Sequence, residues 1–208
     1  MAEYYIPSGD GEAEFVEKRS RFLGHVRLVE TEEEARDFIA QMKKKYYDAR
    51  HNCWCYIIKD GAERYSDDGE PQGTAGIPML EVFRREGLCN VVCVVTRYFG
   101  GILLGAGGLL RAYTRSAKDA LDAAGVSVVR RWVEMELRCS YAMAERLKTE
   151  IAAFDGVAGE PDYGADVTLH AFIPEEKGED FAARIFDLSH GSVEARSIGE
   201  DFRPVPIR

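Results

Sequence analysis

A cluster of glycines directly after an apolar run constrains the fold of this chain more than any other feature. Residues 90–96 (NVVCVVT) are apolar almost throughout, which predicts a central strand covered on both faces. The next twelve residues, RYFGGILLGAGG, contain five glycines, after which Leu110, Tyr113 and Ala117 recur at helical spacing. The segment therefore predicts a strand, a glycine loop and a long amphipathic helix in succession.

The glycine loop has two interpretations that the sequence leaves open. Glycines between a strand and a helix let backbone amides converge on an anion at the positive end of the helix dipole. The loop does not match the common phosphate motifs: a P-loop requires Lys-Ser or Lys-Thr where Ala106 and Gly107 stand, and a dinucleotide fingerprint requires glycine at Leu110. Alternatively, the glycines permit tight turns and close packing of the helix on the strand.

Charged residues near this loop suggest a composite site. Arg97 and Arg111 bracket the glycines and have no obvious partner nearby in the sequence, whereas Arg115 and Lys118 each have an acidic residue four positions later. The polar loop SDDGEPQGTAGIP (66–78) offers carboxylates that either hold magnesium or pair with the two arginines, and we expect pairing. The predicted ligand- or anion-binding residues are Asp67, Asp68, Glu70, Thr74, Arg97, Tyr98, Gly100, Gly101, Gly105, Gly107, Gly108 and Arg111.

His51, Cys53 and Cys55 carry groups that bind zinc or act in covalent catalysis. The two cysteines point to the same face of a predicted strand, and no second Cys/His cluster supplies further ligands, so we interpret them as buried strand residues. Neither a Gly-x-Ser-x-Gly elbow nor a His-Glu-x-x-His motif occurs. The sequence therefore predicts no catalytic residue, no metal site and no cofactor.

The remaining pattern indicates two domains in an α+β protein, one over residues 1–131 and one over 132–208. In the first, a charged turn joins two short strands within 14–29, and a capping box at Thr31 begins a helix. The second reads as a β-α-β-β-α-β ferredoxin-like unit. Its predicted elements are a strand from residue 133, a helix at 142–154, strands at 157–163 and 167–173, a helix at 180–190 and a strand at 192–202.

Charge and hydropathy limit the classes of partner. The net charge of −9 disfavours unselective binding to nucleic acid, but residues 132–208 carry 16 acidic and 8 basic residues and account for most of it. A localised basic face on the first domain is compatible with this distribution. No run reaches the roughly 18 apolar residues of a membrane span, and the first thirty residues lack the apolar centre of a signal peptide, so we expect a cytoplasmic protein with no membrane partner.

Four segments together resemble the YigZ/IMPACT family: SRFLGHV (20–26), HNCWCY (51–56), SDDGEPQGTAGIPML (66–80) and NVVCVVTRYFGGILLGAGGLLRAY (90–113). The resemblance implies an N-terminal α/β sandwich like the second domain of a small ribosomal-subunit protein. It implies a ferredoxin-like C-terminal domain similar to domain V of elongation factor G. The family often has a basic residue after Thr-Ala-Gly, where this chain has Ile77.

The resemblance also implies a regulator linked to translation, since the eukaryotic IMPACT protein competes for the ribosome-associated activator of an initiation-factor kinase. We therefore expect a non-catalytic protein whose Arg-flanked glycine loop contacts RNA, the ribosome or a ribosome-associated protein. The alternative is a small enzyme or nucleotide-binding protein that uses the same loop for a phosphorylated ligand, with Asp67, Asp68 or Glu70 holding magnesium or acting as a base.

Overall fold

A computed structural model of the chain describes residues 3–207. They form two compact units, one built from Tyr4–Val129 with the segment that follows Arg203, the other from Arg130–Arg203. The last segment joins the first unit through the Ile207 amide, which donates to the Val126 carbonyl at 2.9 Å. The predicted division into residues 1–131 and 132–208 places this last segment in the second domain, whereas in the structure it belongs to the first unit.

The first unit is built on a five-stranded antiparallel sheet with β6 at its centre. The apolar run of the sequence forms β6, and residues 91–97 are all buried, so the predicted central strand is confirmed. Lys18 and Arg19, both with positive φ, form the two-residue turn of the predicted first hairpin. The strands in sheet order are β2 (Gly11–Glu17), β3 (Ser20–Leu28), β6 (Val91–Tyr98), β4 (His51–Ile57) and β5 (Glu63–Ser66).

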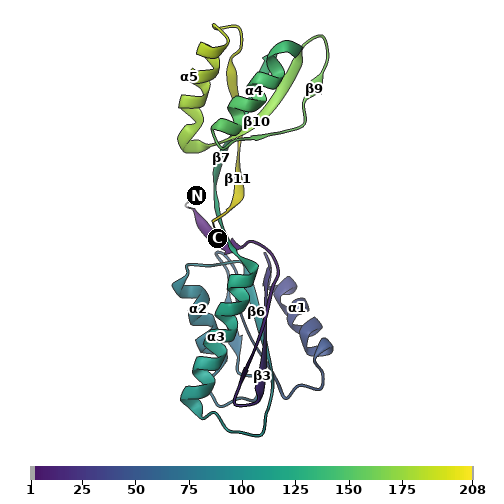
Figure 1. Ribbon diagram of the computed structural model, residues 1–208, viewed down its shortest axis with the longest axis vertical. Coiled ribbons are helices and arrows are strands. Elements are labelled where there is room, and N and C mark those ends of the chain that lie inside the picture. The colour runs from purple at the N-terminus through teal and green to yellow at the C-terminus, as the bar shows by residue number, and fades with distance from the viewer. Residues whose placement is uncertain (1–2, 208) are drawn as a thin grey trace. The chain divides into compact units, whose positions relative to one another are not determined.

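Three helices cover the two faces of this sheet (Figure 1). On one face, α1 (Glu32–Lys45) packs against Tyr56, Val92 and Val94. On the other face, α2 (Gly76–Arg85) and α3 (Ala106–Ala124) bury the cysteines of β4 and β6 in the main core. Adjacent residues of β6 therefore lie in different cores, which explains why its sequence is apolar without alternation.

Side-chain oxygens that accept hydrogen bonds from backbone amides fix the starts of α1 and α2. The Thr31 hydroxyl accepts a hydrogen bond from the Glu34 amide at 3.2 Å, so the predicted cap of α1 is confirmed. α2 begins at Gly76, within the polar loop 66–78 of the sequence, although no side chain of its own N-cap residue, Ala75, caps it. The Asp67 carboxylate accepts hydrogen bonds from the amides of Ala75 and Gly76, at 3.0 and 2.8 Å, and so caps this helix from outside it.

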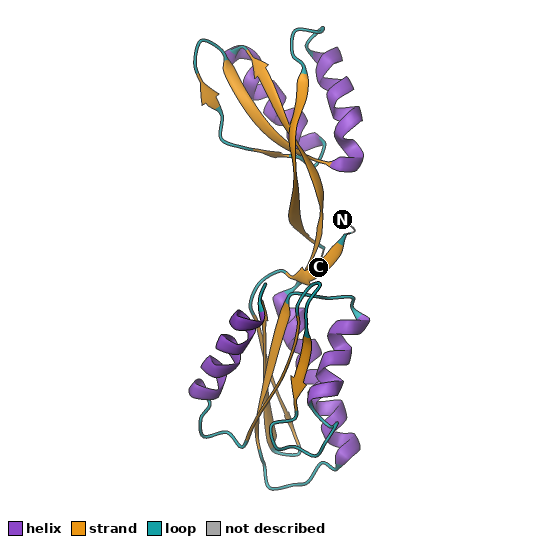
Figure 2. Ribbon diagram, turned by 180° about the vertical axis from the view of Figure 1, so that it is seen from behind, coloured by secondary structure: helices purple, strands orange, loops and turns teal. Residues whose placement is uncertain are grey.

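The second unit has the predicted ferredoxin-like order, with strands β11, β7, β10 and β8 side by side and two helices on one face (Figure 2). Its core consists of residues from both helices and the inward side of the sheet. The predicted strand 157–163 is wrong as a single element, since Pro161, which has no amide hydrogen, stands between two short strands. The elements are β7 (Val126–Cys139), α4 (Tyr141–Ala153), β8 (Val157–Ala158), β9 (Asp162–Tyr163), β10 (Val167–Pro174), α5 (Gly178–Leu188) and β11 (Ala195–Pro206).

β1 (Tyr4–Pro7) pairs with the beginning of β7, where Tyr4 lies opposite Val129.

Among residues 3–207, no helix is both long enough and apolar enough to cross a membrane.

Gly24 of β3 lies where α3 packs closely on the sheet, since a Cβ added there would come within 2.5 Å of the Ser116 carbonyl oxygen. We expect Gly24→Ala to lower the free energy of unfolding by about 1–3 kcal/mol because the helix must move away from the strand. Denaturant unfolding measures the change. Gly9→Ala is the control, since a Cβ at Gly9 meets nothing within 4 Å; equal stability of the two variants would contradict the close approach.

His25, also on β3, gives the first unit a pH dependence. Burial lowers its pKa, although Glu12, 3.2 Å from its Nδ1, acts in the opposite direction, and its Nε2 is buried without a partner. The imidazole is therefore held neutral in the folded state but takes up a proton in the unfolded chain below about pH 6.5. Stability is fully present above that pH and falls as the pH drops toward the lowered pKa.

We therefore expect the midpoint of denaturant unfolding to fall between about pH 7.5 and pH 5.5 by more in the wild type than in His25→Gln, which cannot titrate. Equal pH dependence in the two proteins would show that His25 is not held neutral.

Candidate functional site

Arg97, at the end of β6, is a buried residue and not an exposed cation. Its side chain is 6% exposed, and its Nη1 donates a hydrogen bond to Glu70 Oε1 at 2.6 Å. Its guanidinium lies between the rings of Phe22 and Phe99, 5.5 and 5.6 Å from their centroids. The expected pairing of a loop carboxylate with Arg97 is confirmed for Glu70. Arg97 is also expected to flank a loop that contacts RNA, but it is buried.

Glu70 joins three elements at this point. Besides the Arg97 of β6, the hydroxyl of Tyr113 on α3 donates to Glu70 Oε1 at 2.8 Å, and Nε2 of His51 on β4 lies 3.9 Å away. The Glu70 side chain is 3% exposed, and burial raises the pKa of the Tyr113 phenol. Tyr113 therefore stays a neutral donor, and the cluster fixes the polar loop against the sheet and the helix.

The other predicted residues of the polar loop shape its backbone. Asp67 accepts hydrogen bonds from the amides of Gly73, Ala75 and Gly76, and Asp68 accepts from the Asn52 amide and from Lys43, both at 2.7 Å. Thr74 donates its hydroxyl hydrogen to the Pro71 carbonyl at 2.6 Å. These groups are engaged within the protein, and among residues 3–207 no three acidic, His or Cys side chains are grouped to hold a metal ion.

Cys53 and Cys55 lie in the core, as the strand interpretation predicts. Burial raises the pKa of both thiols. The thiolate, which is the nucleophile and the metal ligand, is therefore disfavoured at neutral pH.

The glycine loop serves the packing role that the sequence predicts, and it leaves the start of the following helix uncapped. A Cβ at Gly100 would come within 2.0 Å of the Arg19 backbone, so Gly100 allows the loop to pack on the β2–β3 turn. Gly101 and Gly105 have positive φ and open space around them. Gly105 precedes α3, whose first turn has neither a side-chain cap nor an acidic residue. The backbone amides of this first turn, including those of Gly107 and Gly108, therefore remain available to an external acceptor.

A cavity of about 410 Å³ lies between the glycine loop and the polar loop. Its floor includes Glu70 and Arg97, and its wall on one side is the start of α3. Apolar side chains make up much of the rest. The lining residues are Arg50, His51, Gly69, Glu70, Pro71, Arg97, Phe99, Leu103, Leu104, Gly105, Ala106 and Leu109.

Four exposed cations surround the glycine loop, and we call them the basic rim: Lys18, Arg19, Arg50 and Arg111. Lys18 and Arg111 line one depression with Gly108, the Arg19 backbone packs on Gly100, and Arg50 lines the cavity. In the part of the chain that the structure describes, none of the four has an ion-pair partner. Sequence reasoning identified only Arg111, because the other three come from two distant turns.

The exposed surface of the loop itself is apolar. Leu103 is 82% exposed and Phe99 42%, and Ile102 is exposed beside them. Tyr98, one of the predicted binding residues, donates its hydroxyl hydrogen to Asp48 at 2.8 Å and lies under Arg21. The exposed ring next to the basic rim is therefore that of Phe99, one position further along the chain.

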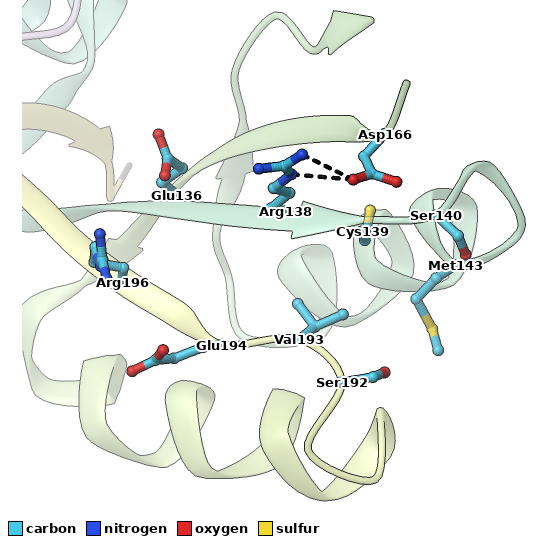
Figure 3. A pocket seen from close by; sticks show the side chains of 10 residues that line it. All are labelled: Glu136, Arg138, Cys139, Ser140, Met143, Asp166, Ser192, Val193, Glu194 and Arg196. Carbon is cyan, nitrogen blue, oxygen red and sulfur yellow. Dashed lines mark hydrogen bonds and ion pairs between the residues drawn. The ribbon is translucent and has the colours of Figure 1, made fainter. Parts of the chain in front are cut away.

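The second unit has its own cavity, of about 700 Å³, formed by the ends of β7 and β10, the start of α4 and the segment leading into β11 (Figure 3). Arg138 points to Asp166 in this view and pairs with it at 3.0 Å. Glu136, Glu194 and Arg196 supply the other charges. Acidic groups outnumber basic ones here, so the cavity does not suit a phosphate.

Comparison with known proteins places these residues in a family context. The model of the Impact N-terminal domain matches residues 18–121, which include the cavity and the basic rim. A model of a domain of unknown function, DUF1949, matches residues 137–192 in the second unit.

Similar proteins match over nearly the whole chain. The IMPACT family member YvyE of Bacillus subtilis is 37% identical over 92% of this chain and 89% of its own length. The IMPACT family member YigZ of Escherichia coli is 34% identical over 96% of this chain and all of its own length. A crystal structure of a hypothetical protein has a TM-score of 0.59 with 33% identity, over 96% of this chain and 98% of that one.

Removing Glu70 should leave the Arg97 charge buried and unpaired. We expect Glu70→Ala to lower the free energy of unfolding by roughly 3–5 kcal/mol. The control is Asp119→Ala, which breaks the exposed pair with Arg115 and should cost less than about 1 kcal/mol. Denaturant titrations that gave similar losses for the two variants would contradict the structural role of the Glu70–Arg97 pair.

Proposed function

Because this chain belongs to the IMPACT family, in its bacterial form with an Impact N-terminal domain followed by a DUF1949 domain, we propose that it is a non-catalytic binding protein whose first unit docks on RNA. The observation that carries the proposal is the basic rim, four exposed cations without ion-pair partners around one loop. Phosphates of an RNA strand neutralise such charges, and counterion release makes the contact favourable.

The composition of the site favours RNA over an acidic protein surface. The Phe99 ring is exposed next to the rim, and a base freed from its stack can lie on such a ring, which is the usual way in which single-stranded or looped RNA is held. The uncapped start of α3 adds backbone donors on the same side. Resemblance to a family linked to translation points to ribosomal or ribosome-associated RNA.

The enzyme alternative requires free carboxylates in the polar loop, and the structure engages all three of them. Asp67 and Asp68 hold backbone amides, and Glu70 is paired with Arg97. A general base needs a carboxylate that can take up a proton from a substrate, and a magnesium site needs oxygens that face the ligand. We therefore assign these three residues to the structure of the loop.

The proposal predicts a salt-dependent interaction with structured RNA that depends on the rim. We expect Arg50→Ala and Arg111→Ala each to weaken binding and to reduce the slope of log affinity against log salt by about 1, because each removes one phosphate contact. Fluorescence anisotropy at several salt concentrations measures this. Arg146→Ala is the control, since Arg146 is an exposed cation on α4 in the second unit.

The proposal would be contradicted by the absence of binding to structured RNA and to ribosomes at low salt. It would also be contradicted if Arg146→Ala and Arg111→Ala weakened binding equally, since the interaction would then depend on overall charge alone.

A further inference from the structure

We propose that the cavity beneath the glycine loop binds a phosphomonoester, either the terminal phosphate of an RNA strand or that of a free nucleotide. This proposal deepens the RNA-binding function. The choice of an RNA strand as the source of the phosphate rests on that function. The basic rim explains contact with the diester backbone of RNA. The cavity next to it has a different composition, with a buried arginine, a helix start and apolar walls, and is suited to a single end group.

The first argument concerns the start of α3. This helix has 19 residues, and its first turn opens into the cavity at Gly105 and Ala106. No side chain caps it, no acidic residue offsets its dipole, and the Arg111 guanidinium lies near it, 3.6 Å from where a Cβ on Gly107 would be. Free amides and a positive dipole end together favour an anion at this position.

An independent argument comes from Arg97. This side chain lines the cavity and is 6% exposed, but its Nε has no hydrogen-bond partner among the described residues. A buried donor without a partner is costly in a folded protein unless a ligand or water completes it. His51 and Arg50 line the same cavity. Its lining therefore holds three basic side chains and one carboxylate, that of Glu70, whose charge is already offset by Arg97.

The rest of the lining suits an organic group. Phe99, Leu103 and Leu109 line the cavity with apolar side chains. The cavity therefore suits the sugar and base of one nucleotide better than it suits a bare phosphate ion.

The charge of the ligand distinguishes a strand end from the strand interior. A phosphomonoester carries about −1.5 to −2 at neutral pH, whereas each internal diester of a strand carries −1. The volume of about 410 Å³ is in the range of sites for small ligands, and Arg97 and Glu70 close its floor. A terminal nucleotide can enter such a site without the chain having to leave on the far side.

The test compares ligands that differ only in the monoester. Anisotropy titrations would use one RNA oligonucleotide with a 5′-phosphate, with a 3′-phosphate or with neither, competed by a nucleoside monophosphate. We expect an end phosphate to tighten binding by on the order of tenfold or more, since charge-assisted hydrogen bonds are worth that much.

The variant Ala106→Asp places a carboxylate at the start of α3, where the phosphate would bind, and an acidic residue in a first turn does not weaken a helix. We expect it to abolish the preference for the phosphorylated strand, whereas the nearly isosteric Ala106→Asn retains most of it. Arg111→Ala should weaken both strands alike.

The outcomes separate the two proposals. If RNA binds through the rim but shows no preference for either end phosphate, and the monophosphate does not compete, the cavity proposal is overturned while the RNA proposal stands. If the monophosphate binds and Ala106→Asp prevents it, without any RNA binding, the cavity proposal stands with a free nucleotide as its ligand and the RNA proposal falls. A preference that survives Ala106→Asp would place the phosphate elsewhere and overturn the cavity proposal.

Discussion

The buried ion pair between Glu70 and Arg97 is the interaction on which the rest of the first unit's surface depends. Two opposite charges leave water at this point, and the arrangement is favourable only because Tyr113 and the aromatic rings of Phe22 and Phe99 complete the surroundings. The pair joins the polar loop to the central strand next to the glycine loop. It therefore forms the floor of the cavity and holds its two sides in place.

The glycine loop follows from the same packing. Gly100 permits contact with the β2–β3 turn and so brings Arg19 to the loop, while Gly105 turns the chain into α3 and leaves the first amides of the helix uncapped. Structure and surface chemistry are thus divided between segments, since the carboxylates of the polar loop stabilise the backbone and the cations of the basic rim remain exposed. This division is the physical basis of the proposal that the surface binds anions.

Sequence reasoning predicted the central strand, the glycine loop, the long helix and the ferredoxin-like order because each has a local signal in composition or periodicity. It failed where exposure depends on tertiary packing. β6 is buried on both faces, so its sequence does not show that Arg97 turns inward, nor that Phe99, and not Tyr98, is the exposed ring. Lys18 and Arg50 lie on separate turns, and only the sheet brings them near the glycines.

Amide hydrogen exchange tests the central claim most directly, because it reports on the loops one residue at a time. In Glu70→Gln, which keeps the shape of the side chain but removes its charge, the account predicts faster exchange at Gly73 and Ala75, whose amides donate to Asp67. It predicts the same at Gly100, whose amide donates to the Ser20 hydroxyl. The amides of β10 in the second unit should exchange as in the wild type. Unchanged exchange in both loops would show that they are ordered without the ion pair and would contradict the account.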